Sequence, residues 1–189
     1  SLNNQLIYQV TNKAGGTNLV QTTEGWRPSY KTTGTNGLSA ALFNTGGFST
    51  NIAISILEST FIIACFQPTD NDLKVLFGIS KTNTIAESKE HLLAGNVESN
   101  PRIWLPTPNR YLIATAQFGT NDGLLRVNNI STTGNNYSAS GGGISLGAYN
   151  QRYNVSKATV CEAIVYNRRL SSNEYISVEK YLNNKWNIF

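Results

Sequence analysis

The stretch that decides the fold is the C-terminal sequence ATVCEAIVYNRRLSSNEYISVEKYLNNKWNIF, which runs from Ala158 to Phe189. Residues 158–166 form an apolar run rich in β-branched side chains, and this pattern predicts a strand. Ser171 and Glu174 then give the S-x-x-E spacing of a helix capping box, in which each side chain satisfies a backbone N–H at the start of a helix. The sequence therefore predicts a strand, a short turn and a helix in that order.

The predicted helix carries one apolar stripe. Leu170 and Tyr175 occupy the positions of a hydrophobic staple on either side of the cap. Apolar side chains then continue at helical spacing, at Val178, Leu182 and Trp186. Because such a stripe has to pack on the sheets, we expect the helix to cover the core, with Trp186 and Tyr181 buried.

The composition favours one all-β domain that spans residues 1–189. Only 14% of the residues are charged, so Asn, Ser, Thr and Gly must cover much of the surface, and these residues suit β turns. The net charge of +4 comes from scattered side chains, and the longest basic run is Arg168-Arg169. A nucleic-acid partner is therefore not expected.

Short apolar or alternating segments recur between turn clusters, as in an antiparallel sandwich rather than in alternating β and α units. We expect strands at residues 5–11, 18–22, 38–43, 51–57, 61–67, 73–80, 102–105, 110–118, 124–130, 144–149 and 158–166. Residues 85–93 suggest a short helical turn. Residues 131–143 have no periodicity and predict a mobile loop that is a candidate recognition surface.

The two cysteines do not have the spacing of a zinc site or of a disulfide framework. Cys65 and Cys161 lie in apolar runs, which favours buried free thiols, although a disulfide stays open if the two strands are neighbours. The longest apolar stretch, residues 61–66, is too short to span a membrane. Since the chain starts at Ser1 and contains no Met, we expect it to be cut from a longer chain.

The C-terminal stretch resembles the concanavalin A-like, laminin G-like jelly-roll superfamily, whose members often end in a strand closing on Y-N-R, then L-S, then a helix finishing Y-L-x-x-K-W. The matching residues are Glu162, Ile164, Tyr166, Asn167, Arg168, Leu170, Ser171, Glu174, Tyr181, Leu182, Lys185 and Trp186. Weaker similarity extends to residues 27–30, to the strand before Pro68 and to residues 125–129. The resemblance implies an all-β, antiparallel jelly-roll β-sandwich with a short C-terminal α-helix.

The start of the chain departs from that superfamily. Its members commonly have a further strand and a W-x-D motif there, whereas residues 10–15 read VTNKAG. Because open sheet edges tend to be covered, we hypothesise that a neighbouring chain completes the N-terminal edge.

The acidic residues do not form a glycosidase motif. Retaining members of the superfamily carry E-x-D-x-x-E on one strand, and no such run occurs here. A pair of carboxylates from separate strands, facing a sugar from both sides, stays open. We therefore expect that the chain is not an enzyme, with a glycoside hydrolase as the less favoured alternative.

Two other polar features have plainer interpretations. His91 is the only histidine and no G-x-S-x-G motif accompanies it, so a solvated loop or helix residue is favoured over a catalytic base. Asp70, Asn71 and Asp72 offer oxygen ligands that calcium accepts, but the rest of an EF-hand loop is missing and a polar turn is favoured. We expect no cofactor, with calcium as the alternative.

Aromatic side chains in or near irregular segments are the candidates for ligand binding. Their flat faces give a large contact area at low entropic cost, so they can stack on sugars or hold a protein. The plainer interpretation is that Trp104 is half-buried in its strand and that the tyrosines cover sheet edges. The predicted ligand-binding residues are Trp104, Tyr137, Tyr149, Asn150, Arg152 and Tyr153.

These observations predict a non-catalytic, lectin-like recognition module that binds a glycan or a cell-surface receptor. We expect the module to be carried on a phage virion or a microbial surface; the charge-poor composition fits either setting and does not decide between them. A purely structural role in a virion or filament, with copies of the chain as partners, is the alternative. Neither nucleic acid nor insertion into a membrane is expected.

Overall fold

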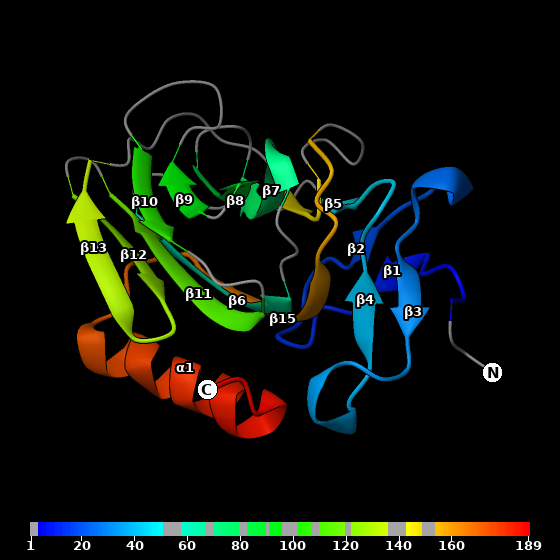
Figure 1. Ribbon diagram of the computed structural model, residues 1–189. Helices are drawn as coiled ribbons and strands as arrows, with labels where there is room; N and C mark the ends of the chain where they lie inside the picture. Colours follow the sequence, from blue (N-terminus) through cyan, green and yellow to red (C-terminus); the bar gives the residue numbers. More distant parts are fainter. Residues whose placement is uncertain are drawn as a thin grey trace.

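The protein is a β-sandwich with one α-helix on its outside (Figure 1). The structure, a computed structural model, describes residues 4–50, 58–66, 70–79, 83–89, 91–95, 102–106, 110–119, 122–135, 143–148 and 154–189. Two antiparallel sheets pack face to face, and the helix lies on the outer face of one of them. The fold class predicted from the sequence is confirmed.

The sheet that carries the helix has seven strands in the order β13-β12-β11-β6-β15-β4-β3. Their bounds are Ser29–Lys31 (β3), Ala40–Leu42 (β4), Ser59–Phe66 (β6), Tyr111–Phe118 (β11), Gly123–Val127 (β12), Ile130–Gly134 (β13) and Thr159–Tyr166 (β15). The C-terminal strand β15 pairs with β6 on one side and with β4 on the other. The strand at which the sequence argument started therefore lies inside the sheet and not at its edge.

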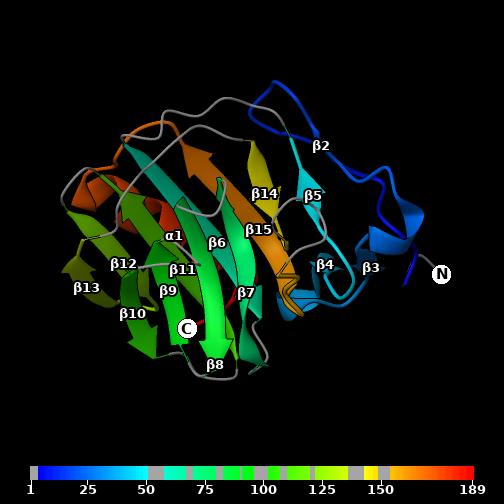
Figure 2. The same ribbon diagram turned by 90° about the horizontal axis from the view of Figure 1, so that it is seen from above.

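The second sheet has eight strands in the order β1-β2-β5-β14-β7-β8-β9-β10 (Figure 2). Their bounds are Gln9–Val10 (β1), Leu19–Val20 (β2), Phe48–Ser49 (β5), Asp70–Ile79 (β7), Asn83–Lys89 (β8), His91–Gly95 (β9), Arg102–Pro106 (β10) and Ile144–Leu146 (β14). Two 3₁₀ turns, η1 (Glu24–Trp26) and η2 (Thr35–Gly37), connect the N-terminal strands.

The N-terminal segment joins the two sheets along one side of the sandwich. The backbone N–H groups of Asn4 and Ile7 donate to Tyr30 and Pro28, each at 2.7 Å, so this segment pairs with β3. A few residues later, β1 pairs with β2 of the other sheet. The N-terminal segment therefore lies beside β3, and completion of the N-terminal edge by a neighbouring chain stays a prediction.

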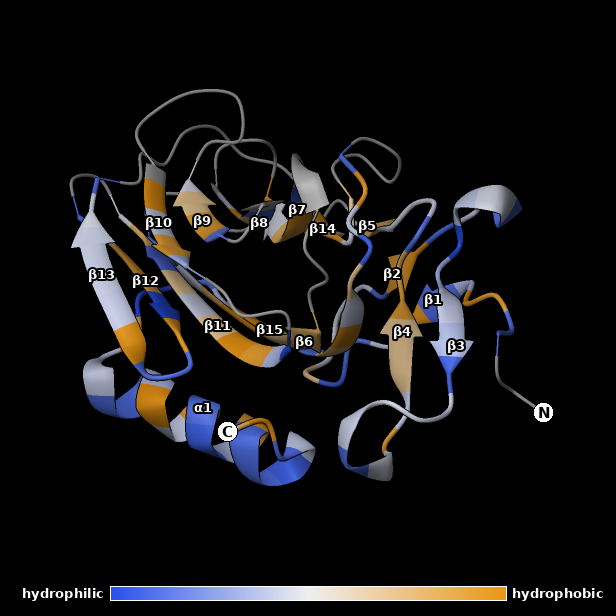
Figure 3. Ribbon diagram, viewed as in Figure 1, coloured by the Kyte–Doolittle hydropathy of each residue, from blue (hydrophilic) through white to orange (hydrophobic). Residues whose placement is uncertain are grey.

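The main core lies between the sheets and is apolar. Alternate residues of β6 point into it, and the Phe61 ring meets Phe77 and Phe118 edge to face, with centroids 4.9 and 5.6 Å apart. Such aromatic contacts add to the free energy gained by burying the rings. In Figure 3 the apolar colouring of β6, β11 and β15 marks this layer, whereas the exposed side of α1 is polar.

The two cysteines face opposite sides of the seven-stranded sheet. Cys65 belongs to the core between the sheets, whereas Cys161 packs under the helix. Both thiols are free. Although β6 and β15 are neighbours, the alternation of side chains across the sheet keeps the two sulfur atoms apart, and burial raises the pKa of Cys161 to about 12.

The helix α1 spans Ser172–Trp186, as the capping box predicted. The Ser171 N–H and hydroxyl both donate to Glu174 Oε2 at 2.8 Å. Leu182 and Trp186 are buried against Ile62 and Ile113 of the sheet. Among the described residues, no helix is long and apolar enough to cross a membrane.

The prediction that Tyr181 is buried is wrong, since 48% of this residue is exposed. Tyr181 lies beside the apolar stripe, and its hydroxyl donates to Glu162 Oε1 at 3.2 Å. Glu162 Oε2 accepts from Lys185 Nζ at 2.7 Å and from Trp186 Nε1 at 3.0 Å. Burial raises the pKa of Glu162, but these hydrogen bonds outweigh burial and hold the pKa below its usual value.

Polar side chains also join the middle of α1 to the sheet. Glu179 is 4% exposed, and its carboxylate accepts from the Arg126 Nε and the Thr115 hydroxyl at 2.8 and 2.7 Å. Such a buried carboxylate needs these partners, because removing an unpaired charge from water costs roughly several kcal/mol of free energy. The helix is therefore fixed in register on β11 and β12 as well as held by apolar contact.

Several strand predictions need correction. The predicted strand at 124–130 is two paired strands, because β12 ends at Val127 and β13 begins at Ile130. Residues 85–89 and 91–93 belong to the strands β8 and β9 and do not form a helical turn. The predicted loop at 131–143 begins with a strand, because β13 extends to Gly134. Strand β7 starts at Asp70, so the predicted turn at Asp70, Asn71 and Asp72 is part of a strand. The predicted strand at 51–57 lies outside the described residues.

Candidate functional site

Trp104 projects from the outer face of the eight-stranded sheet, on its edge strand β10. Its neighbours Ile103 and Leu105 point inward and are buried in the main core, so the strand cannot rotate. Trp104 itself is 40% exposed. The residue is thus half-buried in its strand, as the plainer interpretation of the sequence had it, and still presents ring surface to solvent.

His91 stands next to Trp104 on the adjacent strand β9. Trp104 pairs with Leu93 and Pro106 pairs with His91, so the histidine and the tryptophan are diagonal neighbours on one face. Their ring centroids are 6.2 Å apart and the planes meet at 87°. His91 is exposed, as predicted, but it lies on a strand and not in a loop or helix.

An apolar row crosses the outer face of this sheet and ends at Trp104. Val75 pairs with Ala86, Ala86 with Leu93, and Leu93 with Trp104. The first three of these side chains form a cluster of their own, separate from the core between the sheets, and are fully buried. Trp104 is the exposed end of this row.

The other predicted ligand-binding residues, Tyr137, Tyr149, Asn150, Arg152 and Tyr153, lie outside the described part of the chain. The described residues on either side of 149–153 are close together, because Ser156 N–H donates to the Gly147 carbonyl at 2.8 Å. Gly147 has a φ of +79°, and a Cβ there would lie 2.0 Å from the Phe43 ring, so the position requires glycine.

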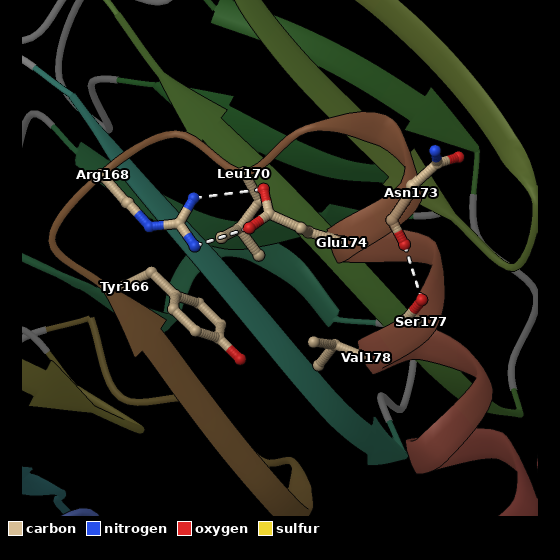
Figure 4. A pocket seen from close by; sticks show the side chains of 7 residues that line it. All are labelled: Tyr166, Arg168, Leu170, Asn173, Glu174, Ser177 and Val178. Carbon is tan, nitrogen blue, oxygen red and sulfur yellow. Dashed lines mark hydrogen bonds and ion pairs between the residues drawn. The ribbon is translucent and has the colours of Figure 1, made fainter.

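A groove of about 370 Å³ lies on the opposite side of the molecule, between the end of β15 and α1 (Figure 4). Its lining residues are Tyr166, Arg168, Leu170, Asn173, Glu174, Ser177 and Val178. In Figure 4 the Tyr166 ring faces the opening, with the Arg168 and Glu174 side chains above it and Val178 across from it.

A bidentate ion pair forms one wall of this groove. Arg168 Nη2 donates to Glu174 Oε1 at 2.7 Å, and Nη1 donates to Oε2 at 3.1 Å. Hydrogen bonds from Arg168 and from Ser171 lower the pKa of Glu174 to about 2. The carboxylate is therefore ionised at neutral pH, and its charge cancels that of the guanidinium.

Sequence reasoning named Tyr166, Arg168 and Glu174 only as parts of a structural ending and missed the groove. The S-x-x-E pattern was fully explained by the helix cap. The ion pair between Arg168 and Glu174 brings the loop after β15 against the start of α1. This contact, which forms one wall of the groove, is visible only in the structure. The arginine of the Y-N-R motif, a few residues before the capping glutamate, is the sequence signal that could have indicated the groove.

The acids are dispersed over the molecule. Among the described residues, no three His, Cys, Asp or Glu side chains come together as a metal site. The side chains of Asp70 and Asp72, where calcium was the alternative prediction, lie outside the description. Several described acids have structural partners: Glu87 accepts from the Ser156 hydroxyl at 2.8 Å, and Asp122 accepts from Arg169 at 2.6 Å.

Known folds resemble this one at low sequence identity. No family model and no curated protein sequence matches the chain. Domain 4 of the extracellular GH43 arabinanase AbnA from Geobacillus stearothermophilus, solved with arabinotriose, has 16% identity, a TM-score of 0.58 and 83% coverage of both chains. A GH54 α-L-arabinofuranosidase has 15% identity and a TM-score of 0.71 over 93% of this chain and 50% of its own.

The sialidases give two further neighbours. The CBM40 domain of the Ruminococcus gnavus IT-sialidase has 13% identity and a TM-score of 0.51, covering 72% of this chain and 97% of its own. The Trypanosoma rangeli sialidase in complex with sialic acid has 14% identity and a TM-score of 0.59, with 77% of this chain covered. This chain spans only 28% of that sialidase. These similarities show the β-sandwich fold.

Proposed function

We propose that this chain is a non-catalytic carbohydrate-binding module and that Trp104 is the main contact for the sugar. The observation that carries the proposal is the exposed Trp104 ring, fixed on a rigid strand beside His91. Sites built on strands hold their side chains more firmly than sites on loops. The side chains that contact the sugar therefore lose little conformational entropy when it binds.

The chemistry of the two rings suits a saccharide. The face of an indole ring is electronegative and attracts the weakly positive C–H groups on one side of a sugar ring. An imidazole beside it supplies a hydrogen-bond donor and acceptor for hydroxyl groups. Trp104 and His91 together offer an apolar face and a polar edge at one place, which matches the two sides of a sugar.

The known folds support this choice of ligand class. The neighbours include a domain solved with arabinotriose, a sialidase solved with sialic acid and a CBM40 domain. Their sequence identities of 13 to 16% leave the particular sugar open. We propose a glycan on a cell surface as the partner.

The proposal excludes catalysis. Hydrolysis of a glycosidic bond needs two carboxylates that face the sugar. Glu162, Glu174 and Glu179 are engaged in ion pairs that attach α1 to the rest of the molecule. Neither Trp104 nor His91 requires a metal or cofactor in this role, so chelation by EDTA is expected to leave binding unchanged.

The setting is also a proposal. We place the module on a phage virion or a microbial surface, as the superfamily resemblance of the C-terminal stretch suggests. A structural role in an assembly is the second candidate, and the exposed side chains of Leu6 and Tyr8, at 48% and 50%, favour it. These residues lie near the N-terminal edge, where contacts between copies would bury them.

The experiment is a glycan array followed by calorimetric titration of the best-binding glycan. Trp104→Ala is expected to weaken binding at least about tenfold, because loss of a central aromatic anchor costs ~2 kcal/mol or more. Tyr8→Ala removes an equally exposed aromatic at the N-terminal edge and serves as the matched control. An array without binders, or equal affinity for Trp104→Ala and the parent, would refute the proposal.

A further inference from the structure

From the groove between β15 and α1 we infer a second ligand site, which takes a neutral saccharide unit through Tyr166 and the Arg168–Glu174 pair. The groove lies between α1 and the end of β15 (Figure 4), a strand of the seven-stranded sheet, whereas Trp104 lies on β10 of the other sheet. The inference is independent of binding at Trp104 and assigns the domain two separate contacts with a glycan.

The size and lining of the groove fit a small amphipathic ligand. Its volume of about 370 Å³ lies near the lower end of ligand pockets, which span ~300–1,000 Å³. Leu170, which is buried, and Val178 supply an apolar surface. The Tyr166 ring adds an aromatic face, and in Figure 4 its hydroxyl points away from the Arg168–Glu174 pair. A ligand there contacts apolar and polar groups together.

The ion pair retains capacity for hydrogen bonds to a ligand. Glu174 Oε2 already accepts from Arg168 Nη1, from the Ser171 N–H and from the Ser171 hydroxyl. Glu174 Oε1 accepts only from Arg168 Nη2 within the described part of the chain. Oε1 has two lone pairs and this one donor, so it can accept a further hydrogen bond from a ligand hydroxyl.

Arg168 supplies the complementary donors. Its Nη1 protons are directed to Glu174 and to the Arg169 carbonyl, and one Nη2 proton goes to Glu174. The guanidinium has five N–H donors, so the Nε proton and the second Nη2 proton keep no acceptor among the described residues. A donor beside an acceptor on one planar pair matches two adjacent hydroxyl groups of a sugar.

The charge of the groove decides between neutral and anionic ligands. An isolated arginine would attract a carboxylate or phosphate, but Glu174 is ionised and holds Arg168 in a bidentate pair. An acidic ligand would have to displace that carboxylate or lie against it, and like charges close together repel. The groove is therefore selective for uncharged hydroxyl groups.

The test is ¹H–¹⁵N NMR titration of the intact chain with matched sugars, D-galactose against D-galacturonate and D-glucose against D-glucuronate. Within each pair the ring and its hydroxyl configuration are the same, and a C6 carboxylate replaces the C6 hydroxymethyl group. The backbone amides of Tyr166, Leu170 and Ser177 are expected to shift with at least one neutral sugar. The matching uronate is expected to bind at least about tenfold more weakly, because its carboxylate is repelled by the ionised Glu174.

A blocking variant separates the site from the fold. Ser177 is exposed on the groove wall, and Ser177→Trp places a bulky side chain there without removing any buried group. It is expected to abolish the shifts. Lys180→Trp adds the same side chain at an exposed position of the same helix, outside the groove, and is expected to keep them.

The outcomes distinguish the two sites. Shifts near Trp104 without shifts in the groove would refute the second site and leave the proposed function standing. Shifts confined to the groove would support the second site and count against Trp104. Tighter binding of the uronates, shifts that persist in Ser177→Trp, or no shift with any of the four sugars would each overturn the inference.

Discussion

The outer faces of the two sheets each carry a tryptophan, and the two tryptophans differ in exposure. On the seven-stranded sheet, α1 covers the strands, and Trp186 beneath it is 4% exposed. On the eight-stranded sheet, Trp104 lies at the end of an apolar row and is 40% exposed. The same type of side chain is buried under the helix on one face and exposed to solvent on the other.

Polar contacts follow the same division. Beneath α1, Arg126 and Thr115 bind Glu179, while Lys185 and Trp186 bind Glu162. These groups hold the helix in register. Removing any one of them leaves its partner beneath the helix without a hydrogen bond or ion pair, which costs free energy. The comparison therefore predicts that changes under the helix lower stability, whereas changes at Trp104 lower affinity.

The largest expected effect comes from replacing the two tryptophans with alanine, one in each variant. Trp186→Ala should lower the free energy of unfolding by about 3–5 kcal/mol, because it opens a cavity in the cluster under α1. Trp104→Ala should cost ~1 kcal/mol or less, as expected for a substitution at a partly exposed site. Urea unfolding measures both, and equal losses would break the distinction between the two faces.

A smaller effect is expected from the buried ion pair. Arg126→Ala leaves the Glu179 carboxylate without its cation, and we expect a loss of about 3 kcal/mol, the lower end for such pairs because Arg126 keeps 14% exposure. Arg169→Ala breaks the exposed pair with Asp122 and should cost less than about 1 kcal/mol. A loss in Arg126→Ala no larger than in this control would show that apolar contact alone positions α1.

The smallest effect is a pH dependence at the helix cap. Hydrogen bonds from Arg168 and Ser171 lower the pKa of Glu174 from 4.5 to about 2. A folded-state pKa below the unfolded value stabilises the fold above pH 4.5, and this contribution disappears as the pH falls toward 2. Chemical unfolding of Glu174→Gln over this range should show a shallower loss of stability than the parent.

Glu58→Gln is the control for that measurement, since it removes one carboxyl from an exposed position. If Glu174→Gln and the parent lose stability in parallel between pH 4.5 and 2, the cap does not contribute through its charge.

The elements that could be predicted from the sequence are those with local signals. The capping box at Ser171 and Glu174 and the stripe through Leu182 and Trp186 depend on residues three or four apart, and the helix followed from them. Tyr181 was misplaced because its spacing from Val178 also fits a helix face. Its ring lies beside the stripe, and only the position of Glu162 on the sheet fixes its hydroxyl.

The errors fall where pairing with distant strands overrides local preference. Residues around Ala86 and Glu87 contain good helix formers, yet they pair with β7 and β9 on both sides. The strand β13 shows no alternation because most of its side chains are exposed at the sheet edge. In both segments the pairing with other strands decides the structure, and the spacing of apolar residues along the sequence does not reveal that pairing.

The two candidate sites differ in how far sequence reasoning could reach them. Trp104 was predicted, because a tryptophan in a strand next to turn residues is conspicuous without any fold. Its neighbour His91 was not connected to it, since the contact depends on the register of β9 and β10. The groove was missed entirely, because its walls combine the end of a strand, a turn and two turns of helix.

The position of β15 has a consequence for synthesis of the chain. Before residues 159–166 leave the ribosome, the seven-stranded sheet consists of two separate parts, β3–β4 and β6–β11–β12–β13. Each part has an unpaired edge, and such edges pair readily with other chains. Long-range pairing is also slow. Until β15 is synthesised, β4 and β6 therefore each keep an unpaired edge, and we expect chaperones to bind along β6 during that time.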